Sequence, residues 1–176
     1  MENPQPNSKK IILNYGLMLG LISVLLGVVM YVTNAYLNPS FVYSLIGFAI
    51  LVVFITLGIN AYKKENANYL SIKEALKIGV GISLIGGIIS VIWLLLLMYV
   101  IEPDFISQLA DVQREQIDSQ YPNMNDEQKQ NALEMSAKFS SPGIMAAFSL
   151  VGNLFFGLLI SLVVGLIKKN KNPYEA

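Results

Sequence analysis

The residues of this chain that could do chemistry are few, and their types exclude most enzymatic mechanisms. The sequence contains no cysteine and no histidine. Disulfides, thiol nucleophiles, thiolate and imidazole metal sites, and the commonest general base at neutral pH are therefore excluded. Haem and iron–sulfur ligation by these two residue types is excluded as well. We expect no enzymatic activity, no catalytic residue, no bound metal and no cofactor.

The polar groups inside the long apolar stretches are amides and hydroxyls, without a charged side chain among them. Because ionisable groups buried in a membrane mark ion pathways and proton relays, a transporter built on a titrating carboxylate is disfavoured. Asn153 falls near the middle of its stretch, where an unpaired amide is costly. We expect this amide to find a partner across a helix interface, with contact to a substrate or ion as the alternative.

Small residues recur at helical spacing within three of the apolar stretches, so that each set falls on one helix face. The stripes consist of Ser149, Asn153, Gly157, Ser161 and Gly165, of Gly16, Gly20, Ser23 and Gly27, and of Gly79, Ser83, Gly87 and Ser90. Small side chains let helix backbones approach closely in lipid, so these stripes predict helix packing within a bundle. A homo-oligomer face and a narrow polar seam lined by Asn153 are the alternatives.

Four uncharged apolar stretches must position these residues. They cover residues 11–36, 41–62, 78–101 and 143–167, and the third helix is expected to begin earlier, at about residue 74. About 20 helical residues cross a hydrocarbon core of about 30 Å, so each stretch is long enough to span a bilayer. The chain is 54% apolar and only 14% charged, which favours a membrane environment. The predicted fold is an all-α integral membrane protein, a bundle of four transmembrane helices.

The distribution of lysine and arginine predicts the orientation of the chain. Nine of the twelve basic residues flank the stretches on one side, which the positive-inside rule assigns to the cytoplasm. Residues 1–10 and 168–176 are then cytoplasmic tails. Contact with lipid headgroups on this side is expected for Lys63, Lys64, Lys73, Lys77, Lys168 and Lys169. Between the second and third stretches, Ser71 and Glu74 have the spacing of a capping box that opens a helix.

The outer loop, residues 102–142, carries eight acidic and three basic residues and has the pattern of two helices. Pro122 marks a turn between them. Asn125 and Gln128 form a capping-box pattern for a second helix that ends near Phe139. We expect a helical hairpin that either packs on itself as a lid or presents a surface to a partner.

Three segments of the sequence resemble one bacterial family. They are Ser71-Ile-Lys-Glu-Ala-Leu-Lys-Ile-Gly79 with the Gly/Ser-rich stretch after it, Tyr99-Val-Ile-Glu-Pro-Asp-Phe105, and Gly165-Leu-Ile-Lys-Lys169. Over nearly its whole length the chain is similar to the bacterial membrane family called domain of unknown function 4199. The resemblance implies a four-helix protein of the bacterial cytoplasmic membrane, and it implies no activity, ligand or functional residue.

Two functions from different classes are compatible with these observations. The first is a non-enzymatic interaction, assembly or accessory subunit, which contacts another membrane protein or a second copy of itself through the outer loop. The second is a component of small-solute or ion transport that works as an oligomer. The twelve basic and twelve acidic residues cancel, so the expected partners include the lipid bilayer and exclude nucleic acid.

Overall fold

The computed structural model describes residues 6–170, and this part of the chain folds into helices without a named strand. Four helices are long: α1 (Ser8–Val32), α2 (Phe41–Glu65), α3 (Ile72–Leu96) and α6 (Pro142–Lys168). A short π-helix, η1 (Leu97–Ile101), follows α3, and α4 (Phe105–Gln120) and α5 (Asp126–Phe139) connect η1 to α6. The predicted all-α class is confirmed.

The four long helices have the length and the composition of membrane spans. Each contains 25 to 27 residues. At 1.5 Å per residue that is roughly 40 Å of helix, more than the hydrocarbon core of a bilayer requires. Each also contains a strongly apolar window. These features are typical of a membrane protein, as the sequence predicts.

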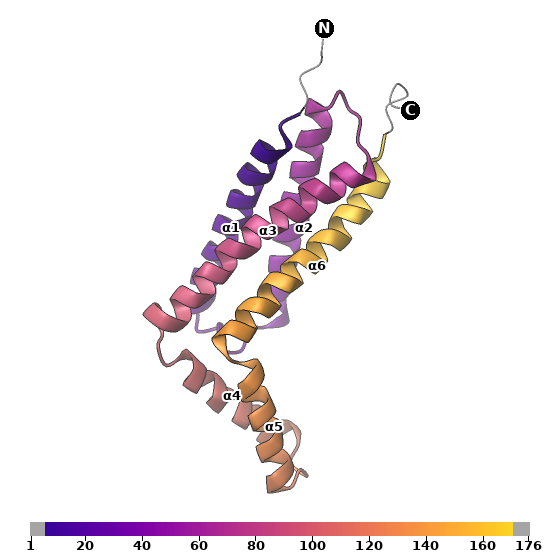
Figure 1. The fold of residues 1–176 in the computed structure, drawn as a ribbon. Coiled ribbons are helices and arrows are strands. Elements are labelled where there is room, and N and C mark those ends of the chain that lie inside the picture. The colour runs from indigo at the N-terminus through magenta and orange to yellow at the C-terminus, as the bar shows by residue number, and fades with distance from the viewer. Residues whose placement is uncertain (1–5, 171–176) are drawn as a thin grey trace.

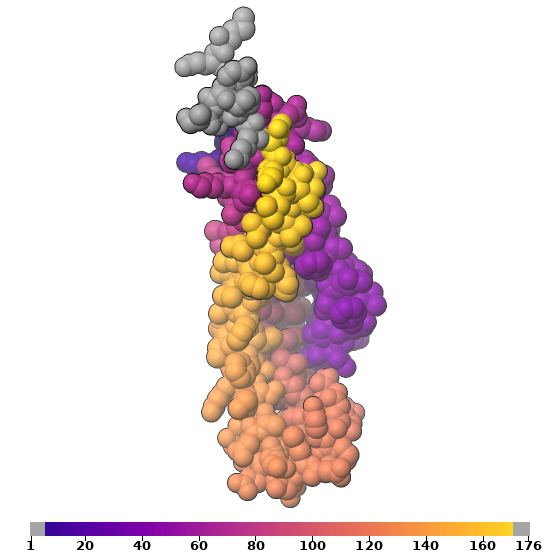
Figure 2. All heavy atoms as spheres, turned by 90° about the vertical axis from the view of Figure 1, so that its right-hand side faces the viewer, coloured from indigo at the N-terminus to yellow at the C-terminus, as the bar shows by residue number. Residues whose placement is uncertain are grey.

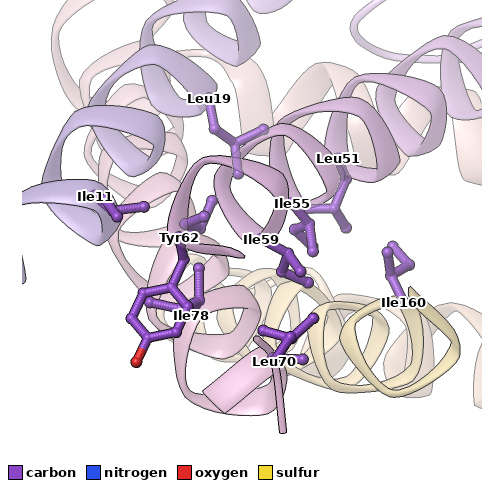
Figure 3. Packing of buried hydrophobic residues seen from close by; sticks show 11 residues of the cluster. Ile11, Leu19, Leu51, Ile55, Ile59, Tyr62, Leu70, Ile78 and Ile160 are labelled. Carbon is purple, nitrogen blue, oxygen red and sulfur yellow. The ribbon is translucent and has the colours of Figure 1, made fainter. Parts of the chain in front are cut away.

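Helix α3 is the centre of the bundle. It packs most extensively against α1 and α6, which lie on its two sides, while α2 contacts all three (Figure 1). The core between these helices is aliphatic, and Ile55, Ile59 and Ile78 are completely inaccessible within it (Figure 3). In lipid the advantage of such a core comes from close packing more than from exclusion of water.

Helix α1 ends in a Schellman motif instead of continuing to the end of its apolar stretch. Asn34 has a φ of 56°, in the left-handed region. The amide of Ala35 donates to the carbonyl of Met30 at 2.8 Å, and the amide of Asn34 donates to the carbonyl of Tyr31 at 3.0 Å. These bonds satisfy carbonyl groups that the helix end would otherwise leave open. Residues 33–40 therefore form a connection and do not continue the span.

Helix α2 ends in the same way, but with an alanine in the left-handed position. Ala67 has a φ of 49°. The amide of the next residue, Asn68, donates to the carbonyl of Lys63 at 2.9 Å. Glycine is the usual residue at this position because a Cβ atom is unfavourable there. The turn brings Asn68 back toward the last turn of α2.

The capping box predicted for the third long helix is confirmed. The Ser71 hydroxyl accepts a hydrogen bond from the amide of Glu74, and the Glu74 carboxylate accepts one from the amide of Ser71 at 2.7 Å. The same carboxylate accepts a bond from the Tyr62 hydroxyl, also at 2.7 Å. Glu74 thus opens α3 and ties it to the end of α2.

Helices α4 and α5 extend beyond the bundle, at the end opposite to the start of α1 and the end of α6 (Figure 1). Figure 2 shows them as the mass of atoms at one end of an elongated molecule. A second small core anchors them, in which Leu97, Met98 and Phe105 are buried. Helix α5 begins after Asn125, whose side chain and that of Gln128 form a capping box.

Candidate functional site

The small residues of α6 lie against those of α3 in a regular antiparallel register. Successive contacts join Gly165 to Ala75, Ser161 to Gly79, Gly157 to Ser83, and Asn153 to Gly87. Each step moves four residues along both helices. A Cβ atom added at Gly157 would come within 2.5 Å of the Ser83 Cβ atom, and one added at Gly165 within 2.8 Å of the Ala75 Cβ atom. We call this contact the α3–α6 seam, and at Gly157 and Gly165 it leaves no room for a side chain.

The small residues of α1 contact a different face of α3, where large side chains meet them. A Cβ atom on Gly16 would lie 2.7 Å from the Ile85 Cβ atom, and one on Gly20 would lie 2.7 Å from the Ile89 Cβ atom. Gly27 lies under the ring of Trp93. Helix α3 therefore offers a small face to α6 and bulky residues to the glycines of α1. Ser23, the fourth member of the α1 stripe, lines a cavity described below.

The buried hydroxyl groups of the seam are satisfied within their own helices. Ser83 donates to the carbonyl of Gly79 at 2.9 Å, and Ser161 donates to the carbonyl of Gly157 at 2.6 Å. Both side chains are completely inaccessible. Serine commonly bonds to the carbonyl one turn earlier, which removes the cost of burying the hydroxyl. These two residues contribute close packing and no free polar group.

The amide of Asn153 differs from the expectation in one respect. Its nitrogen donates to the carbonyl of Ser149 at 3.0 Å, within α6, and the expected bond across a helix interface is not found among residues 6–170. The physical reason is its neighbour: Gly87 of α3 has no side chain to offer, and the Cβ atom of Asn153 fills that space. Asn153 packs across the seam but hydrogen-bonds along its own helix.

A cavity of about 370 Å³, open to the surface of the bundle, lies between the long helices beside Asn153. Its polar lining comes from all four long helices: Ser23, Ser44, Ser90, Ser149 and Asn153. Aromatic and aliphatic side chains form the remaining wall, and none of the described lining residues is charged. Ser90 donates to the carbonyl of Gly86. Within the described residues the hydroxyls of Ser23, Ser44 and Ser149 have no hydrogen-bond partner, so they are available to a polar occupant.

An open groove of about 550 Å³ runs along the seam between α4 and α5. Its floor is apolar and consists of Ala110, Ile117, Leu133 and Ala137, while its carboxylates are those of Asp111, Asp118, Asp126 and Glu134. Lys129 pairs with Asp118 at 2.6 Å across the groove. Gln113 of α4 bonds to Ser136 and to Ser140, which joins the two helices a second time. The two helices therefore form a braced pair with an acidic groove.

A polar network holds the first turns of α4 against the bundle. The Tyr36 hydroxyl donates to the side-chain oxygen of Gln108 at 3.0 Å, and the Gln108 amide donates to the Glu102 carboxylate at 2.6 Å. The Tyr31 hydroxyl reaches the same carboxylate at 3.4 Å. Burial, followed by the charge of Glu102, raises the pKa of Tyr36 above its ordinary value. The Tyr36 ring also stacks on that of Phe105.

The lysines expected to contact headgroups lie at one end of the bundle, at the end of α2, the start of α3 and the end of α6 (Figure 1). Lys64, Lys73, Lys77 and Lys169 are exposed. Lys63 has a role that the sequence did not indicate, because its ammonium group donates to the carbonyl of Lys168 at 2.9 Å. A cation at this place satisfies an open carbonyl at the end of α6 and opposes the helix dipole. Lys171, which also counted toward the orientation, lies outside the described residues.

Four long apolar helices around a seam of small residues, with a braced helical pair at one end, define a membrane-type helical bundle. Residues 14–170 match a family described as a protein of unknown function, DUF4199. The chain belongs to this family, as its sequence resemblance indicates. No curated protein and no solved structure matches the chain.

Proposed function

We propose that this protein is a non-enzymatic interaction, assembly or accessory subunit of the bacterial cytoplasmic membrane, and that α4 and α5 are its contact surface. In this proposal both termini are cytoplasmic and the helical pair lies outside. The lysines gathered at the opposite end of the bundle support that orientation. The observation that carries the proposal is the acidic groove between α4 and α5.

The chemistry of the groove specifies the kind of partner. Four carboxylates face two basic side chains, Arg114 and Lys129, and one of the carboxylates is already paired. The apolar floor offers contact area, and the surplus negative charge favours a positively charged ligand. The occupant that fits best is a basic amphipathic segment of another membrane protein, bound on the outer side. The bracing of the pair reduces the entropy that would be lost on binding.

The test is crosslinking in native membranes, followed by purification of the tagged chain and identification of the protein attached to it. The double variant Asp111→Asn/Glu134→Gln removes two charges from the groove. The matched control Glu115→Gln/Glu127→Gln removes two charges from the same helices outside the groove. We expect one heterologous partner that is lost in the groove variant and kept in the control. A partner that survives replacement of residues 103–140 by a short linker would contradict the proposal.

A second function, transport of a small uncharged solute or an ion by an oligomer, is favoured by the cavity beside Asn153. Three of its hydroxyls have no partner within the described residues, and such groups in a membrane favour a polar occupant. Reconstituted vesicles are the direct test. A flux that disappears in Asn153→Leu, with the fold intact, would support transport, and a flux unchanged in that variant would count against this route.

A further inference from the structure

A second cavity lies at the lysine-rich end of the bundle and is distinct from the groove and from the cavity beside Asn153. Its volume is about 500 Å³. The lining comes from α1, α2, the α2–α3 connection and the end of α6, and its polar members are Asn60, Lys63, Lys64, Asn68 and Lys168. The apolar wall is made by Tyr15, Leu57 and Ala61. We call it the lysine pocket.

The charge of the lysine pocket is not balanced by carboxylates. None of its lining residues is acidic. Within the described residues no ion pair involves these lysines, because the ion pair found there joins Lys129 and Asp118 at the other end of the molecule. The nearby Glu74 carboxylate is occupied by Tyr62, Asn66 and Ser71. Positive charge is therefore concentrated in the pocket and available to an anion.

The rim of the lysine pocket is held in place by several hydrogen bonds. The left-handed turn at Ala67 directs the chain back at Asn68, whose carbonyl accepts a bond from the Asn170 side chain at 3.0 Å. Leu70 and Asn170 exchange two backbone bonds, and Lys63 holds the carbonyl of Lys168. The end of α6 is thereby fastened to the α2–α3 connection. These bonds restrict the motion of the rim, which reduces the entropy that binding of a ligand would cost.

The pocket also contains a hydrogen-bond donor without a partner. Asn60 lies one helical turn before Lys64, and within the described residues its amide has no hydrogen bond. Lysine ammonium groups bind phosphate as point charges, and an amide nitrogen adds a directional donor. Lys63 uses one of its three N–H groups on Lys168, so two remain. The combination suits a phosphate group whose attached chain lies along the apolar wall.

We propose that the lysine pocket is a specific binding site for a phosphate-bearing group, placed at the level of the lipid headgroups on the inner side. Basic pockets between transmembrane helices on this side bind anionic headgroups. An anionic phospholipid and free phosphate share this chemistry. The proposal goes beyond general surface attraction, because it predicts one saturable site that depends on Lys63, Lys64 and Asn60. It does not depend on a partner bound to α4 and α5, but its placement on the inner side rests on the proposed orientation.

The test measures lipid binding to the full-length chain, purified in a neutral detergent and freed of lipid. Phosphatidylglycerol is titrated and the bound molecules are counted by native mass spectrometry. Phosphatidylcholine, whose headgroup carries a phosphate but has no net charge, is the comparison. The variant Lys63→Gln/Lys64→Gln removes two charges from the pocket. The control Lys73→Gln/Lys77→Gln removes two charges from the same side of the membrane outside it. A third variant, Asn60→Leu, changes no charge.

We expect a first phosphatidylglycerol to bind the unaltered chain roughly tenfold more tightly than phosphatidylcholine, since the lysines of the pocket attract its net negative charge. The pocket variant and Asn60→Leu lose this preference, and the control keeps it. Competition by millimolar inorganic phosphate would identify free phosphate as a source of the group, and its absence would assign the site to the headgroup. The proposal would be overturned if the two double variants lost the preference for phosphatidylglycerol equally. It would also be overturned if Asn60→Leu kept the preference with its helix content unchanged.

Discussion

The hydroxyl-bearing side chain of Ser83 lies directly against Gly157, at the centre of the α3–α6 seam. Both residues are buried, and neither helix has room for a larger group at this contact. The contacts above and below repeat at four-residue steps on both helices, so this contact shares one register with the rest of the seam. The relationship explains why the last long helix carries small residues at strict spacing.

Replacing Gly157 by alanine should destabilise the bundle by about 1–3 kcal/mol, the usual cost of overpacking. The added Cβ atom would meet the Ser83 side chain, which cannot move away within the helix. The matched control is Gly152→Ala on the same helix, where an added Cβ atom meets nothing within 4 Å. There the higher helix propensity of alanine should leave stability unchanged or slightly raised. Thermal unfolding in detergent compares the two, and equal stability would contradict the seam.

Replacing Ala67 by glycine should stabilise the protein. Ala67 adopts a left-handed conformation that costs a residue with a Cβ atom about 1 kcal/mol or more, and glycine adopts it freely. The control variant Ala49→Gly, inside α2, should lower the stability, because glycine in a helix interior costs about 1 kcal/mol. Thermal unfolding of the two variants gives the sign directly, and a loss of stability in Ala67→Gly would refute this account of the turn.

Replacing Tyr36 by phenylalanine should loosen the attachment of α4 while the bundle stays folded. The variant loses the bond to Gln108, which is worth about 1 kcal/mol. Hydrogen exchange should therefore quicken in the first turns of α4 and remain unchanged in α3. If protection of the amides around Phe105 is the same in both proteins, the network does not hold α4.

The raised pKa of Tyr36 gives the attachment of α4 a pH dependence. A raised pKa in the folded state means that its contribution is complete below the ordinary pKa of tyrosine, about 10. The contribution is lost as the pH rises through the higher folded pKa. An absorbance titration should show a component at high pH that is missing in Tyr36→Phe. An unchanged titration curve would mean that Tyr36 ionises like an exposed tyrosine.

Replacing Asn153 by leucine should change the stability by less than about 1 kcal/mol, because its hydrogen bond lies within α6 and joins no second helix. A bond across the interface would contribute about 0.6–1.7 kcal/mol, and its loss would add to any packing change. The measurement is thermal unfolding in detergent of Asn153→Leu and of Ser161→Ala. Ser161 is the comparison because its side-chain bond also lies within α6. A loss well above that of Ser161→Ala would show that Asn153 holds two helices together.

Much of the fold was predictable because its signals are local. Long uncharged stretches predict membrane-length helices, and the periodic positions of Gly79, Ser83 and Gly87 predict a packing face without reference to any other helix. Ser71 with Glu74, and Asn125 with Gln128, are three residues apart, so their capping boxes are visible in the sequence. The end of α1 also has a local cause, the left-handed conformation of Asn34. An asparagine is too weak a signal to locate the end of a helix from the sequence.

The sequence by itself therefore determined the class of protein, the helices, their small faces and the clustering of lysines, since each depends on residues within a few turns of one another. The tertiary structure decided which faces meet and what they enclose. The register of Gly157 on Ser83, the bond from Lys63 to the carbonyl of Lys168, and the gathering of Ser23, Ser44 and Ser149 around one cavity join residues far apart in the chain. Such contacts depend on how whole helices pack, and no local pattern encodes that choice.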